Sequence, residues 1–384
     1  MPKKSPVVDI ELSVLKWLID SSGWTNEEMA KRLGISTPNI QKIIAGEKKP
    51  TFKQLQELSG IFKRPVAAFL LSKPKYEKPK PKDYRLLPEK ADKFDKKTLL
   101  VLRKTRRLQK LSKELSRNIK YETKTKLEKA KISDSPEKMA DKYRELFELT
   151  LEKQKKFKTA YELFNYLRDV LEDMNIYVFQ FSMPVEDARG FVLVDDSPNI
   201  IVVNTKDSIE ARLFSLIHEF GHILLGESVI DLPDVALSSK DKIESWCNAF
   251  SASFLLPKPM AKDIFIENKA ILTQRKTLNY LSRKYKVSKA MLLLSMTKLD
   301  FIQKKDYENI LNQFKPDLKK EKEKVAKGGG GVSSDRKTLA EMGNKFISLV
   351  AHNYDREFIT YTDALNYLSI KSKNFDKVLA KAKK

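Results

Sequence analysis

Two histidines four residues apart, with a glutamate directly after the first, constrain the fold of this chain more than any other feature. His218, Glu219 and His222 lie in the run Ile-His-Glu-Phe-Gly-His. Apolar residues recur at helical spacing around them, at Leu213, Leu216, Ile217, Phe220 and Leu224. The segment is therefore predicted to be a helix that buries this stripe and presents both histidines, one turn apart, on another face.

Two imidazoles at this spacing can bind one metal ion. Zn²⁺ accepts histidine nitrogens at ~2.0–2.1 Å, and side chains one helical turn apart can supply two of them. Glu219 is predicted near the same open face, where a carboxylate can take a proton from zinc-bound water, whose pKa falls toward ~7. The motif predicts a hydrolytic zinc site with Glu219 as general base. The alternative is an inactive or purely structural metal site.

A catalytic zinc site has three protein ligands and one open position, so a third ligand is expected. The one other histidine, His352, is far along the chain, which favours a carboxylate. Glu244 is the favoured candidate because it opens a second amphipathic segment, 22 residues beyond His222. Other residues could compete for this role, namely Glu227, Asp231, Asp234, Asp241 and the thiol of Cys247.

Short helical segments separated by turns fill the first part of the chain. Apolar residues recur at helical spacing through residues 9–72, which predicts a bundle of five short helices. Thr25 and Glu28 have the spacing of a capping box at the start of the second helix. Gly34 stands where that helix must end in a left-handed residue.

Residues 73–152 are predicted to be a linker followed by a helical connector. Ser72 to Lys82 is rich in proline and lysine, as in an extended linker. From Lys93 to Glu152 the chain is charged and helical in pattern. Because its apolar stripe is short and irregular, we expect a connecting helical hairpin rather than a coiled-coil arm.

Residues 153–310 mix strands and helices. Three β-rich segments, Ile176 to Phe181, Gly190 to Val194 and Ile200 to Val203, precede helices that start near Ser208. A turn-forming sequence separates the second and third segments, so these two are expected to form a hairpin. The sequence predicts a small sheet within a largely helical domain.

The last range, residues 328–384, is predicted to be a joint followed by a small helical unit. Four consecutive glycines, Gly328 to Gly331, begin it. Glycine runs of this kind form flexible connections between folded parts.

Charge is distributed unevenly along the chain. The net charge is +23, yet residues 151–260 have 11 Lys and Arg against 17 Asp and Glu. Residues 1–150 have 36 against 20, and the rest has 27 against 14. This pattern suggests basic parts that bind a polyanion and an acidic part that holds a cation, although the C-terminal excess could equally be a lysine-rich surface.

Composition excludes two classes of protein. The longest apolar runs, such as Met291 to Leu294, fall far short of the ~20 residues of a membrane span, so no membrane association is expected. One cysteine, Cys247, cannot form an internal disulfide, which fits a reducing compartment. No apolar segment follows the first six residues as in a secretory signal peptide, so a cytoplasmic location is predicted.

The His218 to His222 motif and the segment from Glu244 to Pro257 together resemble the ImmA/IrrE family of metallopeptidases. The second segment reads ESWCNAFSASFLLP, with Ser251 where family members commonly have alanine. The resemblance implies an α+β zincin-like core with His218, His222 and Glu244 as ligands and Glu219 as base. It also implies Zn²⁺ as the ion, with Mn²⁺ as the alternative in the cell, and no other cofactor site is predicted.

The family resemblance further implies a protein substrate. Such enzymes typically cut a Xre-type repressor in a stress response or mobile-element switch, and a toxin-system partner is a related expectation. In the zincin mechanism a strand at the cleft edge pairs with the substrate backbone, and Gly190 to Val194 is the candidate strand.

The sequence from Asn26 to Gly46 resembles the helix-turn-helix of Xre/Cro-type repressors, which implies double-stranded DNA as a partner. In such a module the second helix enters the major groove. Candidates for base contact are Thr37, Asn39, Gln41 and Lys42, and candidates for phosphate contact are Lys31, Lys48 and Lys49. The alternative is a bundle that kept this fold and binds protein.

These observations combine into one hypothesis. The chain is predicted to be a mainly α multidomain protein, with a five-helix Xre-type bundle, a helical connector, the zincin-like core and a small helical tail. Its predicted function is that of a cytoplasmic zinc endopeptidase and transcriptional regulator. The alternative is a non-catalytic DNA-binding regulator or antitoxin with a structural metal site.

Overall fold

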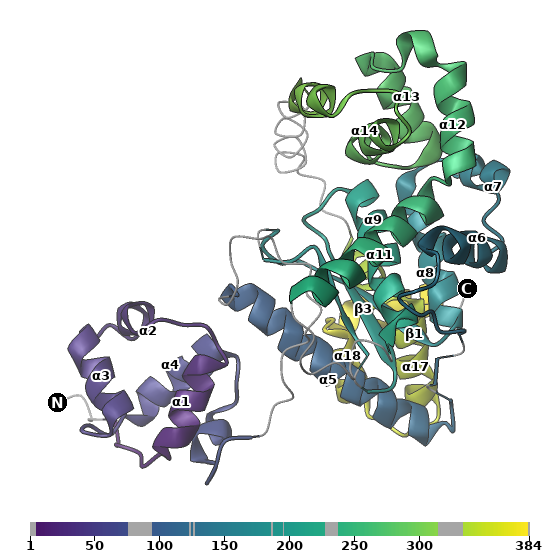
Figure 1. Ribbon diagram of the computed structural model, residues 1–384. Helices are drawn as coiled ribbons and strands as arrows, with labels where there is room; N and C mark the ends of the chain where they lie inside the picture. Colours follow the sequence, from purple (N-terminus) through teal and green to yellow (C-terminus); the bar gives the residue numbers. More distant parts are fainter. Residues whose placement is uncertain are drawn as a thin grey trace. The chain divides into compact units, whose positions relative to one another are not determined.

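The structure is a computed structural model, shown as a ribbon in Figure 1. It describes residues 5–75, 94–122, 124–125, 127–185, 187–194, 196–226, 237–313 and 333–382. Most of the predicted proline-rich linker and the glycine joint at 328–331 lie outside these residues. The described residues form two compact units, and the division between them falls within the helix α5 (Lys96–Asn118). None of the described helices has the length and apolar composition needed to cross a bilayer.

The first unit, purple in Figure 1, is a bundle of short helices around one apolar core. Its elements are α1 (Leu12–Asp20), α2 (Asn26–Leu33), α3 (Thr37–Ala45), α4 (Phe52–Phe62) and the 3-10 helix η1 (Val66–Leu70). The capping box of Thr25 and Glu28 is confirmed, because each side chain accepts a hydrogen bond from the backbone of the other residue. Gly34 ends α2 with a φ of 65°, the predicted left-handed residue.

The second unit contains the rest of α5 and all the elements that follow it. Those before the sheet are α6 (Pro136–Leu146), α7 (Leu151–Lys156) and α8 (Ala160–Asp173). Those directly after it are α9 (Ile209–Leu224), α11 (Leu237–Leu255), α12 (Lys258–Glu267), η2 (Lys269–Ile271), α13 (Arg275–Tyr285) and α14 (Lys289–Lys298). The chain ends with α16 (Ser334–Met342), α17 (Asn344–Asp355), α18 (Tyr361–Leu368), η3 (Ser372–Asn374) and α19 (Phe375–Ala382).

The predicted helical hairpin in the connector is wrong. Helix α5 is a single uninterrupted helix, and the chain from residue 127 to 131 has no helical or strand structure. The next helix, α6, packs against α11. The reason is that the apolar face of α6 supplies Ala140 and Tyr143 to the main core of the second unit.

Three strands form one mixed sheet in the order β1-β3-β2. The strands are β1 (Ile176–Phe181), β2 (Gly190–Leu193) and β3 (Asn199–Asn204). β1 runs parallel to β3, and β2 runs antiparallel to it. The expected hairpin of the second and third β-rich segments is therefore confirmed.

Both faces of the sheet are buried, as expected for strands without polar alternation. On one face Ile176 and Val178 belong to the core that also contains the helices α8, α9 and α11. On the other face Phe179 packs edge-on against Phe346 of α17, with ring centroids 5.7 Å apart. The sheet therefore lies between α9 on one side and the yellow C-terminal helices on the other (Figure 1).

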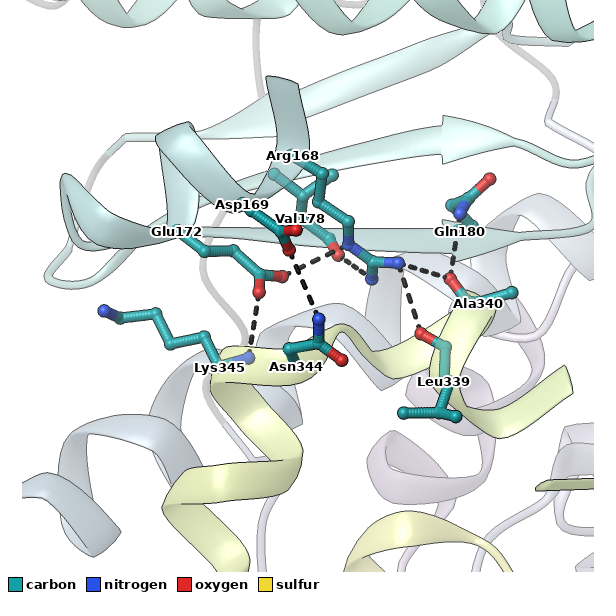
Figure 2. A network of polar contacts seen from close by, with 9 residues as sticks. All are labelled: Arg168, Asp169, Glu172, Val178, Gln180, Leu339, Ala340, Asn344 and Lys345. Carbon is teal, nitrogen blue, oxygen red and sulfur yellow. Dashed lines mark hydrogen bonds and ion pairs between the residues drawn. The ribbon is translucent and has the colours of Figure 1, made fainter. Parts of the chain in front are cut away.

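A buried ion pair on α8 joins these C-terminal helices to the sheet (Figure 2). Arg168 Nε lies 3.2 Å from Glu172 Oε1, and both side chains are buried. Arg168 donates to the carbonyls of Leu339 and Ala340 at the end of α16, over 3.2 and 2.8 Å. Glu172 accepts the backbone N–H of Lys345 at the start of α17, over 2.8 Å. This ion pair therefore satisfies carbonyls at the end of α16 and an N–H at the start of α17 that have no partner within their own helices.

The turn between α16 and α17 accepts this pair because it contains a glycine. Gly343 has a φ of 78°, and a Cβ there would lie 2.1 Å from Glu172 Oε1 and 2.7 Å from Arg168 Nη2. The range 328–384 was predicted as a small separate unit, and that boundary stays a prediction. In the structure its helices belong to the same compact unit as the sheet.

We predict that Gly343→Ala lowers the free energy of unfolding by about 3 kcal/mol, because the new methyl group separates a buried ion pair. Denaturant unfolding followed by circular dichroism measures the change. Gly34→Ala is a control for a positive φ without a steric clash, since a Cβ there meets nothing within 4 Å. It should cost only about 1 kcal/mol of backbone strain. Equal losses for the two variants would contradict the prediction.

Candidate metal centre

The histidine motif lies on helix α9, which is packed into the core of the second unit. Ser208 caps the helix by accepting a hydrogen bond from the Ala211 N–H, and the helix then packs against β2, β3, α8 and α11. His218 is fully buried and His222 nearly so, although imidazoles are polar. Buried polar groups need partners, so the neighbours of these two rings decide what the site can do.

Glu244 on α11 lies within reach of both rings. Glu244 Oε2 is 3.2 Å from His218 Nε2, and Glu244 Oε1 is 3.3 Å from His222 Nε2. The two Nε2 atoms are 3.2 Å apart. The structure therefore brings together the three residues that the sequence predicted as ligands. The Glu244 side chain is 24% exposed, so the site reaches solvent on this side.

This triangle of donor atoms has the size that a tetrahedral zinc ion requires. Bonds of ~2.0–2.1 Å at tetrahedral angles place neighbouring ligand atoms about 3.3 Å apart. Two imidazole nitrogens and one carboxylate also form a ligand set that zinc accepts. Among the described residues, no other group of three such side chains is close enough to share an ion.

Of the competing ligands, only Cys247 has a side chain that the structure describes. Glu227, Asp231 and Asp234 lie outside the described residues, as does the side chain of Asp241. Cys247 is buried beside His222, but it is not part of the group that can share an ion. Burial raises the pKa of the Cys247 thiol, which favours its protonated form over the thiolate that binds metals.

The three groups of the triangle shift one another's pKa values. Burial opposes ionisation of Glu244, yet hydrogen bonds from His218 and His222 hold the Glu244 pKa well below its usual value. Burial also opposes the charged form of His222, but Cys247 and Glu244 raise the His222 pKa well above its usual value. Anionic and imidazole groups in this arrangement hold positive charge between them.

Glu219 lies on the same helix and is fully buried against the beginning of β2. A Cβ on Gly190 would be 3.1 Å from Glu219 Oε1 and 2.9 Å from the Val202 carbonyl oxygen. Glycine at this position therefore allows the strand to pass directly beside the carboxylate. Because β2 is at the edge of the sheet, its outer side is not paired with another described strand.

Asn204, at the end of β3, was not recognised in the sequence. Its side-chain amide is buried and donates to the carbonyls of Met183 and Ala188, over 3.0 and 2.9 Å. Its carbonyl oxygen accepts the backbone N–H groups of Met183 and Lys206, at 3.2 and 3.0 Å. These bonds fix the loop that leads into Gly190. A polar residue that ends an apolar strand is the signal that could have identified it.

We predict that Asn204→Ala costs about 3 kcal/mol of unfolding free energy, because it leaves several buried backbone groups without partners. Denaturant unfolding measures this loss. Asn204→Asp retains the two accepted bonds and loses the two donated ones, so an intermediate loss is expected. Asn268→Ala is a control, since that side chain donates to a single carbonyl and should cost about 1 kcal/mol. A loss no greater than that of the control would refute this account.

All the predicted DNA-contact residues except Lys31 lie on or directly after α3. Gln41, Lys42, Lys48 and Lys49 are exposed, and Thr37 and Asn39 are partly buried. Asn39 and Lys48 are brought together: the Asn39 side chain donates to Ser36 Oγ and accepts from Lys48 Nζ, at 3.1 and 3.4 Å. Lys49 pairs with Asp9 at 2.6 Å. Lys31, on α2, is also exposed.

Each unit contains a segment that matches a known protein family. Residues 15–69 match the family model described as helix-turn-helix. Residues 171–297 match the family model described as the IrrE N-terminal-like domain, which contains all three residues of the triangle and Glu219. The resemblance to ImmA/IrrE proteins with a Xre-type head is confirmed, as is the mainly helical fold with one small sheet. No curated protein matches the chain.

Proposed function

We propose that the protein is a zinc-dependent endopeptidase and transcriptional regulator that cleaves a partner protein. The main support is the triangle of His218, His222 and Glu244, whose atoms fit a tetrahedral ion while Glu219 lies next to an edge strand. A structural metal site would have no use for a buried glutamate beside that strand. The proposal includes a cytoplasmic location, with Mn²⁺ as an alternative ion.

The chemistry follows from the arrangement of the residues. His218, His222 and Glu244 would hold the ion, which when bound polarises a carbonyl and makes water more acidic. Glu219 acts as general base: its carboxylate takes a proton from the attacking water and gives it to the amide nitrogen that leaves. Its full burial strengthens interactions with nearby charges, because little water screens them.

The substrate is expected to bind in an extended form along β2. An edge strand offers unpaired backbone groups, which can pair with a peptide backbone. Gly190 lies at the start of β2 against Glu219, so a peptide paired with this strand would run past the base. The other edge strand, β1, packs against α16, which favours β2 as the binding edge. A Xre-type repressor or a toxin-system partner is the proposed substrate, in a stress response or mobile-element switch.

The helix-turn-helix unit is proposed to bind double-stranded DNA through α3. Its exposed residues have side chains that suit this role: Gln41 can read adenine and Lys42 guanine. Thr37 and Asn39 are further candidates for base contact, while Lys31, Lys48 and Lys49 would contact phosphates.

We predict that Glu219→Gln abolishes cleavage, with a loss of at least about 10²-fold, while metal binding is retained. The assay incubates Zn²⁺- or Mn²⁺-loaded protein with the repressor-like product of a neighbouring gene and follows fragments by mass spectrometry. His218→Ala is the companion variant and should lose both metal and cleavage. Cleavage by the Gln variant, or none by the wild type while it still binds operator DNA, would leave only the non-catalytic regulator.

We predict that Gln41→Ala lowers affinity for a duplex selected from random sequences by about tenfold, with little effect on random DNA, because it removes a base contact. Lys48→Ala should weaken binding to all duplexes and reduce the salt dependence by about one phosphate contact. Fluorescence anisotropy at several salt concentrations measures both effects. An equal loss on selected and random DNA for Gln41→Ala would exclude base reading by this residue.

A further inference from the structure

Gly221 of α9 and Cys247 of α11 meet where the two helices of the candidate metal centre pack together. Gly221 directly precedes His222, and Cys247 is one helical turn beyond Glu244. A Cβ on Gly221 would lie 3.2 Å from Cys247 Sγ and 3.4 Å from Cys247 Cβ. The thiol therefore occupies the space that the missing side chain leaves.

This contact sets how closely the two helices can approach each other. A Cβ contact of 3.2 Å is tighter than ordinary packing, so the neighbour would have to move by a few tenths of an ångström. Cys247 is fully buried, and Phe250 is also 3.4 Å from the same Cβ position. Two side chains of α11 thus resist the change, and a shift of the helix would also move Glu244.

Small displacements matter at this position. Metal–ligand distances must be correct to within about 0.2 Å, and residues that orient ligands typically change affinity by about 10- to 100-fold. Glu244 spans the two imidazoles through separate oxygen atoms, at 3.2 and 3.3 Å. A movement of α11 away from α9 would lengthen both distances together.

We propose that Gly221 and Cys247 are a matched pair of positioning residues that set the distance between α9 and α11 at which Glu244 and both histidines hold one ion. The inference rests on the proposed metal centre. It gives Cys247 a role in setting the helix spacing, in place of a role as a metal ligand or as a core residue without a specific function. It also gives a reason for glycine at a helical position where alanine is the better helix former.

A double-mutant cycle tests the pair through Zn²⁺ affinity, measured on the full chain by competition with a chromophoric chelator. Gly221→Ala should weaken binding by about tenfold or more. Cys247→Ala should have a smaller effect, because it leaves room without forcing the helices apart. The double variant should recover affinity to about the level of Cys247→Ala alone, since removal of Sγ makes space for the new methyl group.

Two controls keep the test independent of folding and of catalysis. Gly60→Ala makes the same change in helix α4, where a Cβ meets nothing within 4 Å, and should leave Zn²⁺ affinity unaltered. Thermal unfolding of chelator-treated protein shows whether each variant is folded. The variants should rank in the same order by melting temperature as by Zn²⁺ affinity. Gly221→Ala should lower the melting temperature, and the double variant should regain most of that loss.

The possible failures are distinguishable. If the wild type does not bind Zn²⁺ better than His218→Ala does, the proposed metal centre itself is wrong. If the wild type binds and Gly221→Ala binds equally well, the spacing argument is overturned. If Gly221→Ala weakens binding and Cys247→Ala gives no rescue, the two residues do not act as a pair.

Discussion

The close packing of α9 against α11 is the constraint on which the second unit depends. It brings two buried imidazoles against a partly exposed carboxylate, and the rings need this partner because little water reaches them. Aromatic side chains hold the helices in place. Tyr143 of α6 packs edge-on against Phe220 of α9, at 5.1 Å, and also against Phe250 of α11, at 6.4 Å. Helix α6 therefore bridges the two helices that carry the candidate ligands.

The small sheet needs covering on both faces, and the chain covers it with segments far apart in sequence. The face with Phe179 is covered by α17, which the Arg168 and Glu172 pair joins to α8. This explains how a range separated by a glycine run can still be integral to the core. It also leaves the two edges of the sheet in different situations. β1 packs against α16, whereas β2 begins beside Glu219. The edge formed by β2 is therefore the better candidate for pairing with a partner strand.

Features that depend on local chemistry could be predicted from the sequence. The capping box at Thr25, the left-handed Gly34, the hairpin of β2 and β3 and the clustering of Glu244 with two histidines each follow from residues with a specific physical requirement. Features that depend on the choice of packing partner could not. The apolar stripe of α6 predicts that one face of the helix is buried, but it does not identify the packing partner. The contact of α6 with α11 was therefore not predicted. The same holds for Arg168 and Asn204, whose partners are mostly backbone groups of distant segments.

The two candidate sites require opposite environments. A surface that binds phosphates needs exposed cations that keep their hydration until DNA replaces it, and Lys42 and Lys48 are exposed in this way. A metal centre needs anionic and neutral donors removed from water, so that attraction to the ion is not screened. The acidic segment 151–260 contains that centre, and the basic segment 1–150 contains α3. The two candidate sites lie in different compact units of the chain, so each has its own environment.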